Sequence, residues 1–211
     1  MLLSVHTFAS LDGVIQGPAA SEEDRSSGFD RGGWLVPLAE EMGDLVDSDW
    51  FAHADALLLG RTTYQLMQPY WSAVTDPDNL TATVLNGHPK YVVSTTLTPE
   101  TATWEKTEVI SDNVLDRVAE LKATPRGELQ VHGSWQLVQS LHQAGLVDLF
   151  RMLIFPVVVG SGKRLFDEGT PPTGFKVASQ KFAGRLVALE LEPVEYTTGE
   201  VGVTEDGREV I

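Results

Sequence analysis

The chain has 211 residues, of which 42% are hydrophobic, and a formal net charge of −15 at pH 7. This length and apolar content suffice to bury one sizeable core, so we expect a single domain over residues 1–211. The acidity argues against nucleic acid or an anionic membrane surface as a partner, since both need clustered lysine and arginine. Cysteine is absent, which excludes disulfides, thiolate metal sites and a cysteine nucleophile.

The N-terminal sequence MLLSVHTFASLDG lacks the basic segment of a signal peptide and turns polar early. No apolar run approaches the roughly 18 residues that a membrane span needs. We therefore expect a cytoplasmic protein whose partners are small molecules or a second copy of itself.

The chain opens with a predicted strand and a turn. Residues 2–9 alternate between two faces, and the strand ends in SLDG at 10–13, where Gly13 can take a positive φ. Residues 16–33 are rich in glycine and charge and form a long loop, which is either functional or a disordered insertion.

A predicted helix and a second strand follow. Residues 37–51 have helical apolar spacing opened by Pro37, and Asp44 lies close to the apolar stripe. Residues 54–59 form a buried strand that runs directly into GRTT at 60–63 and a further helix. In this strand-glycine-helix turn, Arg61 and the two hydroxyls suit a phosphate group.

The second half of the chain repeats this pattern. Residues 72–88 are expected to form a loop with one helical turn around residues 80–85. The expected elements after it are a strand at 91–93 ending in STT, a strand at 108–110, a helix at 113–122 with Asp112 as N-cap, and a strand at 129–131. His132-Gly133-Ser134 then opens a helix with Ser134 as N-cap and Gly145 as its stop. The closing elements are a buried strand over 146–159 kinked at Pro156, a GSG loop at 160–162, and a hairpin of 175–183 and 186–191.

Strands and helices that alternate and close with an antiparallel hairpin predict an α/β fold, with three αβα layers around a mixed, mostly parallel sheet. A glycine turn that opens onto the free N–H groups of a helix start suits an anion. For Gly133 alone a tight turn is the more ordinary explanation, but Gly60 begins a second turn of the same kind. Lys163 and Arg164 either hold a substrate phosphate or end a solvated loop.

Several of these segments together resemble a known family. They are SLDG, LLLGRTTYQ, PKYVVSTTL, VHGSWQL, GLVD and PVVVGSGKRLF. They are similar to the reductase domain of the bifunctional riboflavin-biosynthesis deaminase-reductase, within the dihydrofolate reductase-like superfamily, and above all to its stand-alone bacterial relatives. The resemblance runs from Ser4 to about Glu195 and implies an NADPH-dependent reductase that is usually a homodimer.

The resemblance also implies a cofactor site built from three turns. By position, Gly60, Arg61, Thr62 and Thr63 would meet the cofactor phosphates, with Arg61 at the adenosine 2′-phosphate. Ser94 and Thr95 would lie by the adenosine. The residues implied along the nicotinamide and pyrophosphate are Val131, His132, Gly133, Ser134, Trp135 and Leu137.

The chemistry implied is hydride transfer to a carbonyl or imine carbon of a pyrimidine- or pterin-like substrate, with 5-amino-6-(5-phosphoribosylamino)uracil as one candidate. Asp12 and Asp44 stand where the family suggests a proton donor, although Asp12 also suits a turn and Asp44 a solvated helix face. Two alternatives stay open: a true dihydrofolate reductase, and a dimeric NADP(H)-binding protein without catalysis.

The chain departs from the family pattern in two places. His132-Gly133 stands where dihydrofolate reductases have a glycine pair, so the cis peptide of that pair is not assumed. The zinc deaminase half, with its HxE and PCxxC residues, is absent. The histidines lack metal-ligand spacing, and no hydrolase elbow or P-loop is found.

Overall fold

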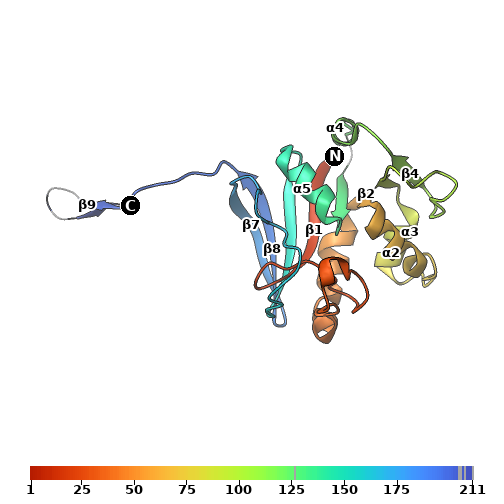
Figure 1. Ribbon diagram of the computed structural model, residues 1–211, viewed down its shortest axis with the longest axis horizontal. Helices are drawn as coiled ribbons and strands as arrows, with labels where there is room; N and C mark the ends of the chain where they lie inside the picture. Colours follow the sequence, from red (N-terminus) through yellow and green to blue (C-terminus); the bar gives the residue numbers. More distant parts are fainter. Residues whose placement is uncertain (126, 204–205, 207, 211) are drawn as a thin grey trace.

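The computed structural model of the chain describes residues 1–125, 127–203, 206 and 208–210, without the side chains of residues 44, 47, 48, 209 and 210. Its centre is an eight-stranded sheet in the order β4-β3-β2-β5-β1-β6-β8-β7 (Figure 1). The strands are β1 (Leu2–Ser10), β2 (Ala54–Gly60), β3 (Lys90–Val93), β4 (Thr107–Ile110), β5 (Glu128–His132), β6 (Leu149–Phe155), β7 (Gly174–Ala183) and β8 (Leu186–Val194). Strands β1 to β6 pair in parallel, whereas β8 pairs antiparallel with β6 and β7. The predicted mixed sheet with its C-terminal antiparallel hairpin is confirmed.

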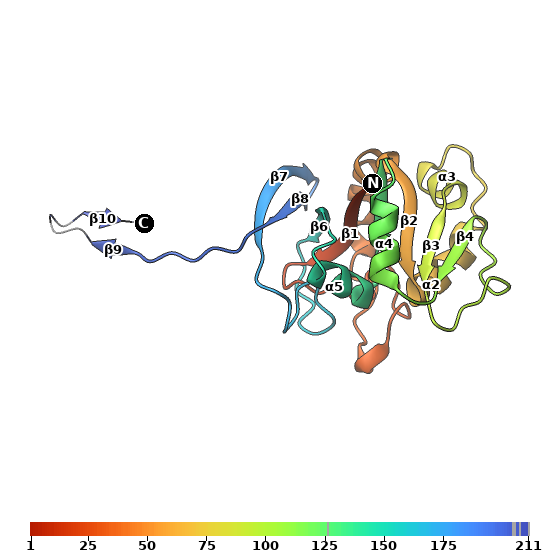
Figure 2. The same ribbon diagram turned by 90° about the horizontal axis from the view of Figure 1, so that it is seen from above.

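Helices cover both faces of this sheet (Figure 2). On one face, α4 (Val114–Lys122) and α5 (Trp135–Gln143) bury their apolar stripes against the inward side chains of β1 and β5. On the other face, α2 (Arg61–Trp71) and α3 (Leu80–Gly87) pack against β2 and β3. The three-layer αβα arrangement is therefore confirmed. Burying each large aliphatic side chain in these clusters contributes roughly 2 kcal/mol.

The expected helix over 37–51 is not one α-helix. The segment is divided into η2 (Val36–Glu41), α1 (Gly43–Leu45), the π-helical turn η3 (Val46–Trp50) and η4 (Phe51–His53). Glycine at position 43 and the Asp and Ser residues after it are weak helix formers, which favours a broken backbone. Packing places the segment nevertheless, because Leu38 and Trp50 are buried against the sheet.

Three smaller differences concern one additional helix and the ends of two other elements. The region near residues 80–85, expected to hold at most one turn, is the helix α3, whose N-cap Asn79 accepts a hydrogen bond from Ala82 N–H. Asn113, not Asp112, is the N-cap of α4 and has a positive φ. Strand β6 stops at Phe155, before Pro156, because proline has no N–H to donate to the sheet.

The long loop after β1 is packed against the domain. Gln16 donates to the carbonyls of Asp24 and Ser26, and Phe29 is buried against Val14 and Val159. The loop also contains the short helix η1 (Ser26–Gly28). These contacts contradict the disordered-insertion alternative, since the loop and the segment after β6 share a small apolar cluster.

The chain leaves the sheet after β8 as an arm that extends away from the domain in both views (Figures 1 and 2). The arm ends in two short paired strands, β9 (Gly202–Val203) and β10 (Glu209–Val210). Among the described residues, no helix is long and apolar enough to cross a membrane.

Candidate functional site

The two predicted strand-glycine-helix turns lie against each other. Strands β2 and β5 are parallel neighbours, so their carboxyl ends meet at one edge of the sheet, where ligands of open α/β sheets bind. Gly60 N–H donates to Ser134 Oγ at 2.7 Å, and Ser134 N–H donates to Thr63 Oγ1 at 3.1 Å. The two hydroxyl oxygens are 2.9 Å apart. Hydrogen bonds thus join the two turns directly.

Glycine is required at this junction for space and for backbone geometry. A Cβ at Gly60 would lie 3.2 Å from Ser134 Oγ, and a Cβ at Gly133 would lie 3.3 Å from Thr63 Oγ1. Gly133 has φ +57°, and Ser134 also has a left-handed backbone, with φ 58°. A left-handed residue other than glycine costs about 1–2 kcal/mol, which points to a functional constraint at Ser134.

The helices that begin at this junction leave their first N–H groups available. Neither α2 nor α5 has a side-chain cap or an acidic residue in its first turn. Both helix starts therefore present partial positive charge at the sheet edge, despite the net charge of −15. Arg61 is exposed in the first turn of α2 and has no hydrogen-bond or ion-pair partner among the described residues. This arrangement suits a phosphate-bearing ligand.

The other residues that the resemblance implies for a cofactor are partly exposed and partly buried. Ser94 is buried at the end of β3, where its Oγ accepts from the N–H groups of Thr96 and Leu97, and Thr95 is exposed. Val131 on β5 and Leu137 on α5 bury their side chains in the same core cluster between the sheet and its helices, so only their main chain is available to a ligand. Thr62 is exposed beside Arg61.

Trp135 connects α5 to the segment that follows β6. Its indole Nε1 donates to Arg164 O at 2.9 Å, and Lys163 Nζ lies 5.8 Å from the centre of its ring. The first residue of α5 therefore contacts the residues that directly follow the glycine loop after β6.

Asp12 joins the turn after β1 to the segment after β6. Its carboxylate accepts hydrogen bonds from Ser10 Oγ at 2.7 Å, Val159 N–H at 3.0 Å and Gly160 N–H at 2.8 Å. Hydrogen bonding to Ser10, followed by that to Val159, lowers the pKa of Asp12 to about 2. An ionised carboxylate with these partners is a poor proton donor, so the contacts favour a positioning role over the predicted catalytic one. Asp44, the other candidate, has its side chain outside the described part of the chain.

Lys163 and Arg164 are held by acidic partners. Lys163 Nζ lies 2.6 Å from Asp24 of the long loop, and an Arg164 guanidinium nitrogen lies 3.7 Å from Asp12. These contacts do not support the alternative that the pair is reserved for a substrate phosphate. The basic pair instead ties the loops after β1 and β6 together.

Comparison with known proteins identifies the family. The family profile described as the RibD C-terminal domain matches residues 2–200. The chain belongs to the RibD C-terminal domain family. Two relatives in Bacillus subtilis (strain 168) bear the names uncharacterized protein YyaP and uncharacterized protein YwjB. YyaP is 33% identical over 159 residues, covering 74% of this chain and 76% of the relative. YwjB is 28% identical over 185 residues, covering 88% and 94%.

Solved structures support the fold of this RibD C-terminal domain. A protein from Shewanella sp. PV-4 named for riboflavin biosynthesis is 22% identical with a TM-score of 0.64, over 92% of this chain and all of that one. Enterococcus faecalis dihydrofolate reductase complexed with NADP(H) and RAB-propyl is 14% identical with a TM-score of 0.56, over 92% and 97%. Acinetobacter baumannii RibD is 16% identical with a TM-score of 0.55, and the match covers 92% of this chain but 58% of RibD. The dihydrofolate reductase-like fold is therefore confirmed.

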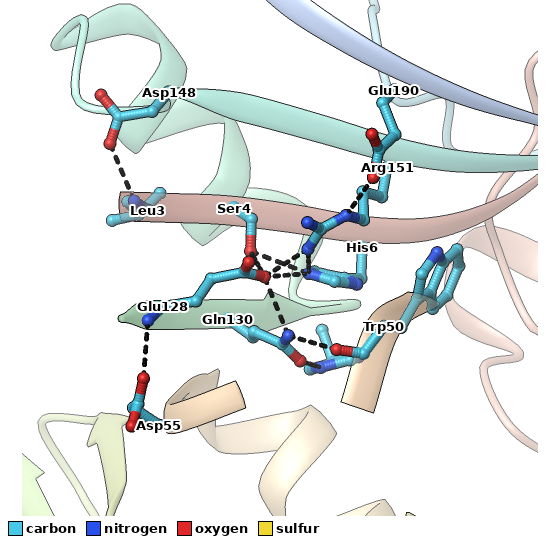
Figure 3. Close-up of polar contacts among 11 residues, drawn as sticks. Leu3, Ser4, His6, Trp50, Asp55, Glu128, Gln130, Asp148, Arg151 and Glu190 are labelled. Atoms are coloured by element: carbon cyan, nitrogen blue, oxygen red, sulfur yellow. Dashed lines mark hydrogen bonds and ion pairs between the residues drawn. The ribbon is translucent and has the colours of Figure 1, made fainter. Parts of the chain in front are cut away.

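A buried polar cluster lies on the face of the sheet that η3 covers (Figure 3). This cluster was not predicted from the sequence. Its members are Ser4, His6, Glu128, Gln130, His132, Arg151 and Glu190. The signal was present as polar residues at every second position of β1 and β5, namely Ser4 and His6 and then Glu128, Gln130 and His132. Such a pattern on two central strands places polar groups inside the domain.

Glu128 is the centre of this cluster. Its Oε1 accepts from Ser4 Oγ at 2.6 Å and Gln130 Nε2 at 2.8 Å, and it pairs with the guanidinium of Arg151. Arg151 also donates to Glu190 at 2.7 Å. Burial raises the pKa of Glu128, but hydrogen bonds from His6, Ser4 and Arg151 outweigh it and lower the pKa to about 2. The carboxylate is therefore charged and compensated inside the domain.

The cluster ends beside the junction of the turns after β2 and β5. His132 Nε2 lies 3.0 Å from Gln130 Oε1, and the His132 ring stacks between His6 and Phe51, with centroid distances of 4.7 and 4.9 Å. Burial lowers the pKa of His6 to about 4 and the pKa of His132 well below its ordinary value. Both imidazoles are thus neutral at neutral pH. None of the described peptide bonds is cis, so the bond between His132 and Gly133 is trans.

Proposed function

We propose that this RibD C-terminal domain protein is an NADPH-dependent reductase. The observation that carries the proposal is the junction of the turns after β2 and β5, where two uncapped helix starts, two glycines and the exposed Arg61 converge. A dinucleotide pyrophosphate needs this combination of free N–H groups and close approach to the main chain. Family membership and the fold shared with an NADP(H)-complexed dihydrofolate reductase support the choice of cofactor.

The residues present fit the cofactor. Side chains larger than hydrogen at Gly60 or Gly133 would fill the space between the two turns. Arg61 is the cation that would meet the 2′-phosphate, and Ser94 and Thr95, at the end of the neighbouring strand β3, would meet the adenosine. When bound, NADPH supplies the hydride.

The remaining residues would position the substrate and supply the proton. Asp12 fixes the segment after β6 beside the turn after β1, next to Trp135 at the start of α5. Proton donation falls to Asp44 in our proposal, because Asp12 is engaged by three donors. The hydride acceptor would be the carbonyl or imine carbon of a pyrimidine- or pterin-like compound. Family membership favours 5-amino-6-(5-phosphoribosylamino)uracil.

The proposal is tested by following NADPH oxidation. Purified protein is incubated with NADPH and either 5-amino-6-(5-phosphoribosylamino)uracil or dihydrofolate, and the loss of nicotinamide absorbance is recorded. We expect turnover with the uracil compound, and a rate reduced at least about tenfold in Asp44→Asn if that carboxyl donates the proton. Turnover only with dihydrofolate would replace the proposed substrate. NADPH binding without turnover on either compound would favour the non-catalytic alternative.

We also propose that the protein is a homodimer. Strand β7 at the edge of the sheet exposes the apolar side chains of Val177 and Phe182, which share one face because their register partners are Leu191 and Val187. Exposed apolar patches of this kind mark association surfaces. Light scattering after size-exclusion chromatography should give twice the mass of the 23.0 kDa chain, and Phe182→Lys should shift the mass toward the monomer.

A further inference from the structure

One buried polar atom among the described residues has no hydrogen-bond partner, namely Nδ1 of His6. The residue is 2% exposed and lies on β1, next to the sheet centre. Native proteins rarely leave such an atom unpaired, so an unpaired one calls for an explanation such as a bound ligand.

The neighbours of His6 place its proton on Nε2. The hydroxyl of Ser4 donates to Glu128, so Ser4 Oγ is left to accept from His6 Nε2 at 2.8 Å. Glu128 Oε1 lies 3.2 Å from the same nitrogen and also favours a proton there. Arg151 Nη1, which can only donate, lies 3.4 Å from this nitrogen, farther than either acceptor, so the two acceptors decide the tautomer. Since a neutral imidazole carries one N–H, Nδ1 of His6 is left as a buried acceptor.

The same reasoning applies to His132. Gln130 Nε2 donates both to Trp50 O at 2.7 Å and to Glu128 Oε1 at 2.8 Å, so the amide oxygen of Gln130 must face His132. His132 Nε2, at 3.0 Å from that oxygen, is therefore the protonated nitrogen. Its Nδ1 is a second acceptor, with no partner among the described residues.

The two imidazoles form one recognition surface. His6 and His132 are register partners on β1 and β5, and their rings stack with centroids 4.7 Å apart. Phe51 stacks on the outer side of His132, and Trp50 lies edge-on to His6 at 5.0 Å. Trp50 ends the π-helical turn η3, and such turns are frequent at functional sites. Aromatic rings thus cover both faces of His132, which leaves the ring edge that carries Nδ1 to receive an N–H donor.

We propose that His6 and His132 form a specificity-determining acceptor pair, whose Nδ1 lone pairs receive hydrogen bonds from N–H groups of the substrate heterocycle once Trp50 moves off His6. The inference rests on the proposed function and deepens it. It selects a pyrimidine with free ring N–H groups over its N-alkylated analogue. Neutral imidazoles can accept in this way, and the burial of both rings keeps them neutral.

The test uses ring ¹⁵N NMR of the labelled full-length protein, with 5,6-diaminouracil and its 1,3-dimethyl derivative as probes, in the presence of NADPH. In the free protein both histidines should be Nε2–H tautomers. Adding 5,6-diaminouracil should move both Nδ1 resonances upfield, and the dimethyl derivative should leave them in place. Calorimetry should show binding of the dimethyl derivative weaker by at least about tenfold.

Variants provide the matched controls. His6→Phe and His132→Phe keep a ring in the stack and should reduce 5,6-diaminouracil affinity at least about tenfold. His142→Phe, at another buried histidine, should not, because His142 Nε2 faces Thr173 on the other side of the sheet. If a phenylalanine variant does not fold, the wild-type NMR result decides alone.

Several results would overturn the inference. They are an Nδ1–H tautomer at His6 or His132, Nδ1 resonances that 5,6-diaminouracil leaves unchanged, and equal binding of the two probes. A thermal shift with NADPH, measured on the same samples, separates this failure from that of the proposed function. If NADPH binds and the Nδ1 resonances stay unchanged, only the acceptor pair is refuted.

Discussion

Two glycines with left-handed backbones allow the proposed cofactor site between the two turns to be tested at the scale of single residues. Gly133 and Gly145 both have positive φ, of 57° and 65°, but only Gly133 approaches another side chain, Thr63. Gly145→Ala should therefore show the left-handed backbone cost alone, about 1–2 kcal/mol. Gly133→Ala should lose at least as much stability and also lose NADPH binding.

The comparison is made by urea denaturation and by NADPH titration of both variants. Because Gly145 has no neighbour near its would-be Cβ, its variant serves as the control for general destabilisation. Equal NADPH affinity in the two variants would contradict a cofactor site between the turns.

Thr63 tests the same junction through a hydrogen bond. Thr63→Val removes the acceptor of Ser134 N–H while keeping the shape of the side chain. The variant should lose about 1 kcal/mol of folding stability and should bind NADPH more weakly. Thr63→Ser keeps the oxygen and should restore NADPH affinity. A Thr63→Val protein that binds NADPH like wild type would show that the hydroxyl has no part in holding the turn for the cofactor.

Among the elements, the paired strands β1 and β5 determine how stability depends on pH. The pKa of His6 is about 4 in the fold against 6.5 ordinarily, so the unfolded chain takes up the proton first as the pH falls. The contribution of His6 is therefore complete above pH 6.5 and declines toward pH 4 by roughly 3 kcal/mol, and His132, whose pKa is also lowered by burial, adds to the decline. Glu128, with its pKa lowered from 4.5 to about 2, continues the decline at lower pH.

Urea denaturation at several pH values between 7 and 4 measures this slope. His6→Phe should make it shallower, because only His132 of the two buried histidines on β1 and β5 is then left to take up a proton on unfolding. His53→Gln, at an exposed histidine, should keep the wild-type slope. An unchanged slope in His6→Phe would mean that His6 is not held neutral in the fold.

The types and order of most elements could be predicted from the sequence, whereas the structure of the segment 36–53, which covers one face of the sheet, could not. Alternating strands, glycine turns and the hairpin at Gly184-Arg185 follow from local periodicity and turn chemistry, which the structure confirms. The segment 36–53 has helical apolar spacing, but weak helix formers after Met42 divide it into four short turns. Its position depends on packing against distant strands, which local patterns do not contain.

The candidate site was predictable only where it depends on local turns. Gly60 and Ser134 were identified as turn residues, but their 74-residue separation hides the hydrogen bond between them. Asp12 looked like a substrate-side acid because its partners Val159 and Gly160 are remote in sequence. The cluster around Glu128 likewise needs the register of β1 against β5 before its members can be seen as neighbours.

For the whole molecule, the C-terminal arm contributes little to the stability of the domain. Both views show it leaving the sheet after β8 without returning, and Val201 and Val203 on it are exposed (Figures 1 and 2). Removing residues 199–211 should change the Tm by less than about 1 °C, since segments without buried contacts add little stability. Differential scanning calorimetry measures this, and a loss of several degrees would show that the arm packs on a domain, either its own or that of a second copy.

The cofactor assignment is tested most directly by a thermal-shift titration with NADPH and NADH in parallel. At about 100 times the dissociation constant, a ligand adds roughly 2.7 kcal/mol of stability, which corresponds to a Tm rise of about 5 °C or more in a chain of this size. We expect this rise with NADPH, a much smaller one with NADH, and near-equal responses to the two in Arg61→Ala. The absence of a shift with either nucleotide would contradict the account, leaving Gly60 and Gly133 as structural turns alone.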